Sequence, residues 1–309
     1  MKLVIFGCGK IAKRIARSCL LVDNIDLVGF ASKDIEKARV YAEEFGCRDH
    51  GDYDHFLNSD VDGVYIATYN KSHFELIRQC LEHHKNVICE KPMLFSVEQT
   101  KEAFELARKN DVLLMEALKS VFLPSIIKVK EMIADKTIGD IKEIYAAFMR
   151  SGDHPEDHWI NDLQTGGAFK DLGSYCVGTI NYLLDKEAKI VTIADDRTDE
   201  RAETTCHCLL DYDGIAGKVS VSNSIDGDTK LSVTGSNGFI EIENFWKNGK
   251  GSYECDEERH EFNEELISDF YYELKHFADL VDNKCKESAI MSEEASLNII
   301  KITDWRNNQ

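Results

Sequence analysis

The sequence predicts an α/β protein of two domains, a doubly wound parallel sheet followed by an α+β domain with a largely antiparallel, open sheet. Two observations lead to this fold class. Up to about residue 120, short apolar runs alternate with amphipathic helical segments, whereas beyond Pro124 several runs of alternating polarity follow one another. The length of 309 residues also suits about two domains. We therefore expect a first domain at 1–120 and a second at 121–265.

The first domain is built from apolar runs that are short enough for buried parallel strands. These runs are Leu3–Phe6, Leu27–Ala31, Val64–Thr68, Val87–Cys89 and Val112–Glu116. The patterns Ser72-x-x-Glu75 and Ser96-x-x-Gln99 match the capping box at a helix start. Gly46 is the expected end of a helix that begins near Lys33.

The second domain contains six β-like runs. They are Ile141–Met149, Lys189–Ala194, Thr204–Leu210, Ala216–Val221, Lys230–Val233 and Phe239–Ile242. The turn at 236–238 predicts a hairpin between the last two runs. One helix is expected at 125–135 and one long helix from the glycines near Leu163 to Leu184; amphipathic helices at Glu264–Val281 and Glu293–Trp305 end the chain.

Composition points to small-molecule chemistry in the cytoplasm. A net charge of −19 repels nucleic-acid backbones and anionic membranes, so neither is an expected partner. The N-terminus lacks the apolar core of a signal peptide, and no segment has the length of a transmembrane helix. The ten cysteines form no Cys-x-x-Cys pair and are expected to be reduced. In a strand, neighbouring side chains of Cys206-His207-Cys208 point to opposite faces, so we assign no metal site.

A glycine-rich turn, Gly7-x-Gly9-x-x-Ala12, follows the first expected strand and opens a helix. Small residues there permit close approach of a pyrophosphate to the helix N-terminus. The pattern predicts dinucleotide binding at Gly7, Cys8, Gly9, Lys10 and Ile11. The alternative is a glycine turn that binds no ligand.

The end of the second expected strand bears on the choice of cofactor. An acid there would hold the ribose hydroxyl of NAD, but the sequence has Ser32 and Lys33 before Asp34. Ser32 and Lys33 are donors suited to a 2′-phosphate, with Arg14 as a further candidate. We therefore expect NADP, with NAD as the alternative if Lys33 is simply a solvated residue.

Four motifs in order resemble the Gfo/Idh/MocA family of NAD(P)-dependent oxidoreductases over nearly the whole chain. The motifs are Gly7-x-Gly9-x-x-Ala12, Ile66-Ala67-Thr68-x-Asn70-x-x-His73, Glu90-Lys91-Pro92 and Gly166-Gly167-x-x-x-Asp171-x-Gly173-x-Tyr175. Many members of the family have histidine at the position of Tyr175. With its tyrosine, the chain is most similar to the branch that contains dimeric dihydrodiol dehydrogenases, xylose dehydrogenases and glucose-fructose oxidoreductases.

The resemblance implies a Rossmann first domain, with residues 266–309 returning to pack on it. It also implies a homodimer or homotetramer assembled through the sheet of the second domain. Further cofactor-binding residues implied by the motifs are Thr68, Asn70, His73, Glu90 and Lys91. For His73, a role in the first turn of a helix without any part in the chemistry is the alternative.

The hypothesis for catalysis uses Lys91, Asp171 and Tyr175. Tyr175 takes the proton of a substrate alcohol while hydride leaves for the nicotinamide, and Lys91 lowers the pKa of Tyr175. Asp171 and Tyr175 are four residues apart, which places them on one helical face, and Asp171 orients Lys91 or a sugar hydroxyl. The expected substrate is a sugar, polyol, trans-dihydrodiol or related hydroxy or carbonyl compound.

Three departures from the family pattern limit what carries over: the first two are expected to alter fit rather than chemistry, and the third leaves the substrate open. Tyr69 stands where proline is usual, Thr165 replaces a glycine, and the loop 154–159 matches no pattern. His154 and His158 are either substrate ligands or surface residues. Two other functions stay open: a regulator that binds NAD(P) without catalysis, and a relative that cleaves glycosides with NAD as a transient oxidant.

Overall fold

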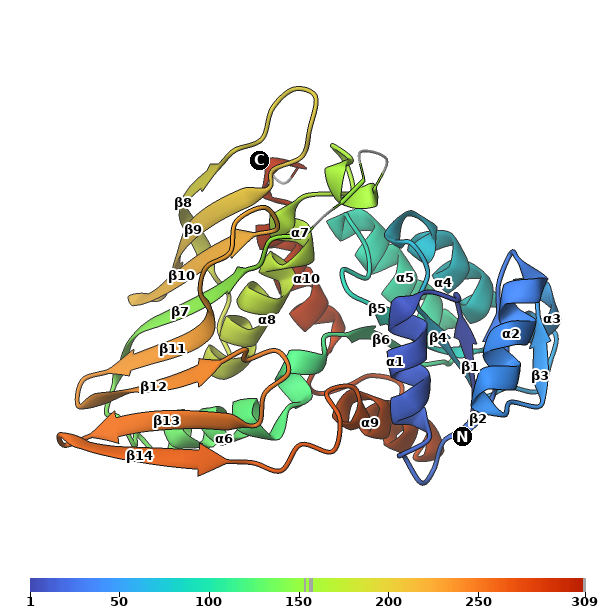
Figure 1. Cartoon of the computed structure of the whole chain (residues 1–309), viewed down its shortest axis with the longest axis horizontal. Helices are drawn as coiled ribbons and strands as arrows, with labels where there is room; N and C mark the ends of the chain where they lie inside the picture. The colour runs from blue at the N-terminus through green and yellow to red at the C-terminus, as the bar shows by residue number, and fades with distance from the viewer. Residues whose placement is uncertain (153, 156–157, 308–309) are drawn as a thin grey trace. The chain divides into compact units, whose positions relative to one another are not determined.

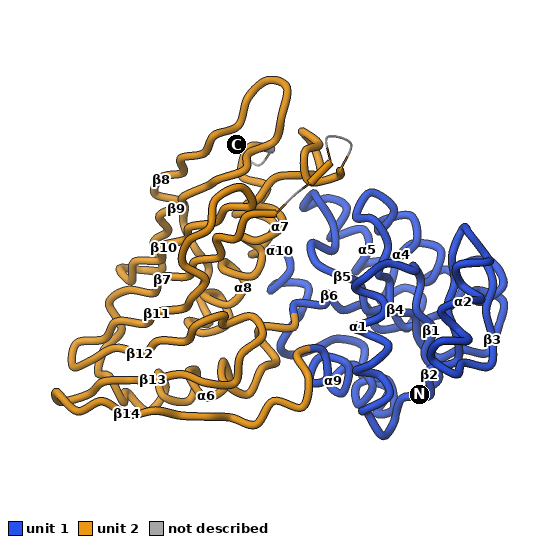
Figure 2. The backbone as a smooth tube through the Cα atoms, in the orientation of Figure 1, with its two compact units in different colours: residues 1–118, 270–297 blue, residues 119–269, 298–309 orange. Residues whose placement is uncertain are grey.

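The computed structural model describes residues 1–152, 154–155 and 158–307. Figures 1 and 2 show that the chain forms two compact units. Unit 1 contains residues 1–118 and 270–297, and unit 2 contains residues 119–269 and 298–309. Compact units need not fold independently, so the domain limits expected above stay a prediction.

Unit 1 has a six-stranded parallel sheet in the order β3-β2-β1-β4-β5-β6. Its strands are β1 Lys2–Phe6, β2 Asp26–Ala31, β3 Asp49–Gly51, β4 Gly63–Ile66, β5 Asn86–Glu90 and β6 Leu114–Ala117. The strand order reverses between β1 and β4, which is where doubly wound sheets bind ligands. The five strands expected from the sequence are confirmed, while β3 has too few residues to leave a pattern.

Helices cover both faces of this sheet. They are α1 Lys10–Cys19, α2 Ile35–Phe45, α3 Tyr53–Leu57, α4 His73–Glu82, α5 Val97–Lys109 and α9 Tyr271–Asp282. Apolar side chains of α3, α4 and α5 form one core with β1, β2, β4, β5 and β6. On the other face, α1 packs against α2 and α9. Because both faces are covered, the strands are apolar throughout rather than alternating.

Unit 2 has an eight-stranded sheet in the order β14-β13-β12-β11-β7-β10-β9-β8. The strands are β7 Ile141–Met149, β8 Lys189–Asp195, β9 Thr205–Tyr212, β10 Ile215–Ser222, β11 Thr229–Gly235, β12 Gly238–Glu243, β13 Lys250–Cys255 and β14 Glu258–Asn263. Pairing is antiparallel except between β7 and β10. This confirms the expected fold class and the hairpin between β11 and β12.

The helices of this unit are α6 Pro124–Ala134, α7 Ala168–Asp171 and α8 Gly173–Leu184. Helix α6 packs against α8. α8 contacts β7 and β10, and α7 contacts β9 and β10 (Figure 1). Helix α10, Glu293–Thr303, crosses the limit between the two units at residue 297. Single helical turns occur at η1 Asn70–Ser72, η2 Lys119–Phe122, η3 Trp159–Asn161 and η4 Trp305–Asn307.

Helix starts and ends agree with the sequence at two positions and differ at one. Gly46 ends α2 in the left-handed conformation, and the Ser96 side chain caps α5 by accepting from the Gln99 amide. Ser72, however, makes no capping bond to α4. Its hydroxyl instead donates to the Tyr69 carbonyl, which closes η1, so the predicted capping box at Ser72 is wrong.

Two other expected helices have different limits. The predicted helix up to Leu184 is interrupted at Leu172, because the Ser174 hydroxyl occupies the Asp171 carbonyl in the turn between α7 and α8. The predicted helix from Glu264 begins only at Tyr271. The Glu264 amide donates to the Gly249 carbonyl and so continues the ladder of β13 and β14, two strands that the sequence analysis missed.

Candidate functional site

The glycine turn lies at the carboxyl end of β1, beside the switch point of the sheet. Gly7 has φ +108°, and a Cβ atom there would lie 2.5 Å from the Ala67 carbonyl oxygen. The Gly7 amide donates to the Ala31 carbonyl at 2.8 Å. Residue 7 therefore has to be glycine for the ends of β1, β2 and β4 to pack this closely.

Gly9 has a different role. A Cβ atom at Gly9 would have no neighbour within 4 Å, so the position faces open space. It precedes α1 without a side-chain cap, and no acidic residue lies in the first turn of α1. Lys10 and Ile11, the first helical residues, are exposed. Uncapped amides at an open helix start are suited to a pyrophosphate.

The end of β2 lies beside this turn. The Cys8 thiol and the Ser32 side chain are hydrogen-bonded, and burial raises the pKa of Cys8 to about 11. Ser32 also accepts from the Asp34 amide at 3.1 Å. Lys33 is exposed, and Arg14 lies over the ring of Phe270, the residue before α9. The structure thus places Cys8 and Ser32 together.

The end of β4 contributes Thr68 and Asn70. The Thr68 hydroxyl bonds the Ser72 hydroxyl at 2.8 Å. The Asn70 amide nitrogen Nδ2 is buried, and no described residue is its hydrogen-bond partner. A buried donor without a partner needs a ligand or water to satisfy it. Beside Asn70, the Tyr69 side chain is 70% exposed.

His73 is fully buried and holds two loops together. Its Nδ1 lies 3.3 Å from the Pro92 carbonyl oxygen and 3.2 Å from that of Met93. Its Nε2 lies 3.2 Å from the Thr68 carbonyl oxygen. Burial lowers the pKa of His73. Both ring nitrogens thus face backbone carbonyl oxygens of the protein.

Glu90 is the last residue of β5 and Lys91 follows it, and the Lys91–Pro92 peptide bond is cis. The buried Tyr65 hydroxyl lies 3.0 Å from the Glu90 carboxylate and 3.1 Å from that of Glu273 on α9. Lys91 itself is half-buried. The structure therefore fixes the residue before Lys91 from the α9 side of the sheet.

In unit 2, Asp171 ends α7 and Tyr175 lies in the first turn of α8. Leu172 between them keeps right-handed helical angles, so the two residues remain one helical turn apart. Asp171 is half-buried and Tyr175 is 7% exposed. Unit 2 thus holds two of the predicted catalytic residues, and unit 1 holds Lys91 with the predicted cofactor residues.

Tyr175 lies in an aromatic cluster that the sequence analysis missed. Its ring centroid is 5.9 Å from that of Phe148 on β7 and 6.1 Å from that of Trp246, and the last two rings stack at 5.0 Å. The Lys119 ammonium lies 4.7 Å from the Trp246 centroid and pairs with Asp269. The Trp246 indole nitrogen is buried without a partner among the described residues.

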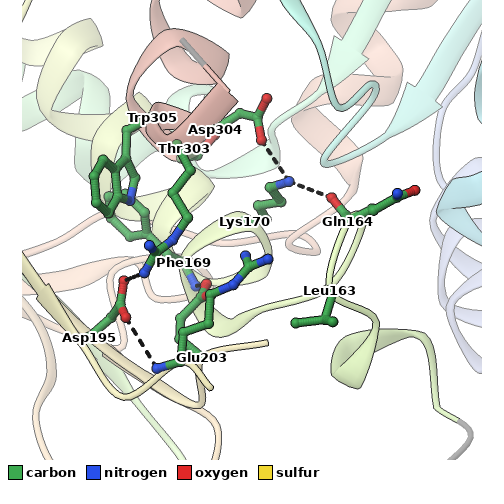
Figure 3. A pocket seen from close by; sticks show the side chains of 11 residues that line it. Leu163, Gln164, Phe169, Lys170, Asp195, Glu203, Thr303, Asp304 and Trp305 are labelled. Atoms are coloured by element: carbon green, nitrogen blue, oxygen red, sulfur yellow. Dashed lines mark hydrogen bonds and ion pairs between the residues drawn. The ribbon is translucent and has the colours of Figure 1, made fainter. Parts of the chain in front are cut away.

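Figure 3 shows a small polar cavity of about 100 Å³ elsewhere in unit 2. Lys170 crosses it and donates to Asp304 at 2.7 Å and to the Gln164 carbonyl at 2.6 Å. Glu203 accepts from the Phe169 amide at 3.2 Å, and burial raises its pKa. These contacts hold α7 on both sides. The polar residues that line the cavity therefore stabilise the helix that ends at Asp171.

The loop around His154 is described only in part, since Glu156 and Asp157 lie outside the described residues. The rings of His154 and His158 are 4.8 Å apart, and the His158 Nδ1 accepts from the Ile160 amide. Thr165, the second departure from the family pattern, donates its hydroxyl to Asp162 at 2.8 Å. Both contacts are local and stabilise the segment before α7.

Within the described residues, no group of three or more His, Cys, Asp or Glu side chains is arranged to hold a metal ion. No helix in that part of the chain is long and apolar enough to cross a membrane. All ten cysteines are free thiols.

Comparisons with known proteins agree with this architecture. Residues 1–118 match the family described as "Oxidoreductase family, NAD-binding Rossmann fold", and residues 126–241 match the GFO/IDH/MocA C-terminal domain. The chain is 28% identical to trans-1,2-dihydrobenzene-1,2-diol dehydrogenase of Xenopus laevis, over 94% of this chain and 91% of that protein. It is 29% identical to the same enzyme of Mus musculus, over 86% and 83%.

Two solved structures share the fold. One is KijD10, a 3-ketoreductase from Actinomadura kijaniata in complex with NADP and TDP-benzene, with a TM-score of 0.91, 22% identity and coverage of 100% and 97%. The other is an aldose-aldose oxidoreductase from Caulobacter crescentus, complexed with glycerol, with a TM-score of 0.90, 22% identity and the same coverage.

The chain belongs to the GFO/IDH/MocA family of oxidoreductases. The predictions of the family, of an NAD(P)-binding Rossmann unit and of an NAD(P)-dependent dehydrogenase or reductase are confirmed. The residues fit a dinucleotide because the turn at Gly7 is tightly packed, the start of α1 is open, and Asn70 has a buried donor without a described partner.

Gly7 and Gly9 offer a matched pair of substitutions. Gly7→Ala forces a Cβ atom against Ala67 and should reduce the free energy of unfolding by about 2 kcal/mol or more. Gly9→Ala meets open space, so stability should change by less than about 1 kcal/mol, while the dissociation constant for the cofactor rises about tenfold. Denaturant unfolding and fluorescence titration measure the two effects. Unchanged cofactor affinity in Gly9→Ala would contradict the binding assignment.

Proposed function

We propose that the protein transfers hydride between NADP and a hydroxy or carbonyl compound with neighbouring hydroxyl groups, such as a sugar, a polyol or a trans-dihydrodiol. The observation that carries the proposal is the aromatic cluster around Tyr175. Phe148 and Trp246 pack beside the proposed acid–base group, and the Trp246 N–H, which has no partner among the described residues, would donate to a substrate oxygen. The names of the relatives, a dihydrodiol dehydrogenase, a ketoreductase and an aldose oxidoreductase, support the same substrate class.

The cofactor would be held by residues of unit 1. The amides after Gly7 and Gly9 receive the pyrophosphate, Ser32 and Lys33 lie at the ribose end, and Thr68 and Asn70 follow the next strand. Cys8, Lys10 and Ile11 complete the turn. His73 holds the backbone at Thr68 and at Pro92–Met93, and Glu90 is bonded by Tyr65, so both would shape the site from the ends of β4 and β5. When bound, the nicotinamide supplies the hydride acceptor or donor.

Tyr175 is the proposed acid–base group. In oxidation its phenolate oxygen takes the proton from the substrate alcohol as the C–H hydride leaves for the nicotinamide, and a carbonyl forms. In reduction the same hydroxyl returns the proton. The Lys91 ammonium stabilises the charged phenolate form of Tyr175, and Asp171 orients either Lys91 or a substrate hydroxyl. The proposal requires the three side chains to act on one substrate molecule.

Substitutions test this assignment. Tyr175→Phe and Lys91→Ala should each lower kcat by about 10²–10⁴-fold, since each removes a group needed for proton transfer. Turnover is followed at the nicotinamide absorbance with a panel of aldoses, polyols, dihydrodiols and dicarbonyls, and cofactor affinity is measured separately.

Tyr212→Phe is a matched control for Tyr175→Phe. The Tyr212 hydroxyl is also buried in unit 2, where it donates to the Asn181 side chain at 2.7 Å. Its removal should lower stability without lowering kcat. Near-normal turnover in both Tyr175→Phe and Lys91→Ala would contradict the proposed chemistry, and cofactor binding without turnover over the whole panel would favour a regulator.

The proposed preference for NADP rests on Lys33 and Ser32, because the first acid after β2 is Asp34, whose side chain accepts from the Lys37 amide and caps α2. Lys33→Ala should raise the dissociation constant for NADPH about tenfold and leave that for NADH nearly unchanged, since only NADPH carries the 2′-phosphate. Fluorescence titration with both cofactors measures this. Tighter binding of NADH to the unaltered protein would refute the preference.

We also propose assembly into a homodimer or homotetramer through the face of the second sheet that lies opposite α8. This face carries an ion pair between Lys218 and Glu143 at 2.6 Å and a hydrogen bond between His207 and Ser220 at 3.0 Å. The reduced thiols support the proposal that the enzyme works in the cytoplasm.

Sedimentation analysis tests the assembly. Ser220→Arg places a bulky charge in the middle of this face and should convert the assembly to monomers while cofactor affinity is retained. Glu105→Arg, an exposed position on α5 in unit 1, should leave the assembly unchanged. A monomeric unaltered protein, or a Ser220→Arg variant that still assembles, would overturn this proposal.

A further inference from the structure

Asp304 is a buried carboxylate just beyond the end of helix α10. Its amide donates to the Ile300 carbonyl at 2.9 Å, and the residue is 2% exposed. A negative charge at this end of a helix meets the negative end of the helix dipole, so α10 gains nothing from it. A buried carboxylate is also costly unless it is paired. The position of Asp304 therefore has to be explained by what its side chain binds.

The partner of Asp304 is Lys170 on α7. The Lys170 ammonium lies 2.7 Å from an Asp304 carboxylate oxygen and donates to the Gln164 carbonyl at 2.6 Å (Figure 3). Lys170 is 8% exposed, so solvent does little to screen the pair. One ammonium thus ties α7 both to the end of α10 and to the segment that precedes α7.

These ties matter because α7 is short. Its four residues, Ala168–Asp171, are too few for a helix that is stable on its own. At its start, the Glu203 side chain accepts from the Phe169 amide at 3.2 Å and the Glu203 carbonyl accepts from the Ala168 amide at 3.0 Å. Nearer its end, the anchor is Lys170. The orientation of α7 therefore depends on these tertiary contacts.

Lys170 directly precedes Asp171. Successive side chains of a helix point about 100° apart, so fixing the direction of Lys170 also fixes the direction of Asp171. Replacing a buried ion pair by apolar residues often costs little stability, which means that such a pair is better explained by the geometry that it imposes. The geometry imposed here is the rotation of α7 about its own axis.

We propose that Asp304 is a positioning residue, which acts through Lys170 to hold α7 in the orientation that Asp171 needs. It does so through the buried ion pair, without touching the substrate. The importance of this for catalysis rests on the proposed function, in which Asp171 orients Lys91 or a substrate hydroxyl. The effect on α7 can be measured without substrate or cofactor.

Hydrogen exchange tests the anchoring of α7. Asp304→Asn keeps the size of the side chain and removes its charge. In the cofactor-free protein, the amides of residues 164–172 should then exchange with deuterium several-fold faster, because the pair that anchors them is weakened. Peptide mass spectrometry reads this exchange against that of β11 and β12 in the same unit, which should not change.

The matched control is Arg306→Gln. Arg306 lies two residues beyond Asp304 and pairs with Asp195, the last residue of β8. The substitution loosens the same segment of chain but leaves the pair between Asp304 and Lys170 intact, so exchange over 164–172 and kcat should both stay normal. Unchanged exchange over 164–172 in Asp304→Asn would overturn the inference, as would an equal increase in Arg306→Gln.

Kinetics give the second readout, measured for each variant well below its unfolding temperature. Asp304→Asn should lower kcat about tenfold with cofactor affinity unchanged, and it should have no further effect in an Asp171→Asn background. A merely structural role of Asp304 would instead lower kcat by the same factor in both backgrounds.

The double variant Lys170→Met/Asp304→Leu decides the question if Asp304→Asn does not fold, because it leaves no unpaired charge in the interior. It should show the same faster exchange over 164–172 and the same loss of kcat. Normal turnover in Asp171→Asn would mean that the proposed function of Asp171 fails. Lost turnover in Asp171→Asn, with normal kcat and normal exchange in the double variant, would mean that the role of Asp304 fails instead.

Discussion

The structure of unit 1 depends on how firmly the four residues from Glu90 to Met93, at the end of β5, are held. Tyr65 bonds the Glu90 carboxylate, His73 bonds the carbonyls of Pro92 and Met93, and Glu116 accepts from the Met93 amide. These contacts come from β4, α4 and β6, so the neighbours of β5 in the sheet all contribute. A lysine on such a frame loses little conformational freedom when it meets a ligand, which is the condition for a preorganised site.

The glycine turn follows from the same parallel arrangement. In a parallel sheet the carboxyl ends of β1, β2 and β4 meet at one edge, and only glycine at position 7 lets the backbone pass Ala67. The packing of the sheet does not require glycine at position 9, since the space beside Gly9 is open. The two glycines are alike in sequence, but the first serves the packing of the sheet and the second serves access to the start of α1.

Local signals explain what the sequence could predict. The apolar runs gave five of the strands in the parallel sheet, and the positions of Gly46 and Ser96 gave correct helix limits. The capping box at Ser72 was wrong because Ser72 lies in η1 with helical backbone angles instead of the extended angles of an N-cap. The strands β13 and β14 were missed because they carry polar residues with no apolar run. The aromatic partners of Tyr175 could not be predicted from the sequence. Phe148 and Trp246 are far from Tyr175 along the chain and come close to it only in the folded unit. Glu116 could have been noticed in the sequence as an acid within an apolar strand. The sequence analysis did not single it out because it followed the family motifs.

The strong negative charge of the chain is compatible with an anionic cofactor because the two act over different distances. At physiological ionic strength, charges in water are screened over about 8 Å. Most of the 56 acidic residues therefore have little electrostatic effect at the start of α1. What matters there is local: uncapped helix amides, no acid in the first turn, and the lysines at positions 10 and 33. The net charge of the whole chain is therefore compatible with a dinucleotide at this one helix start.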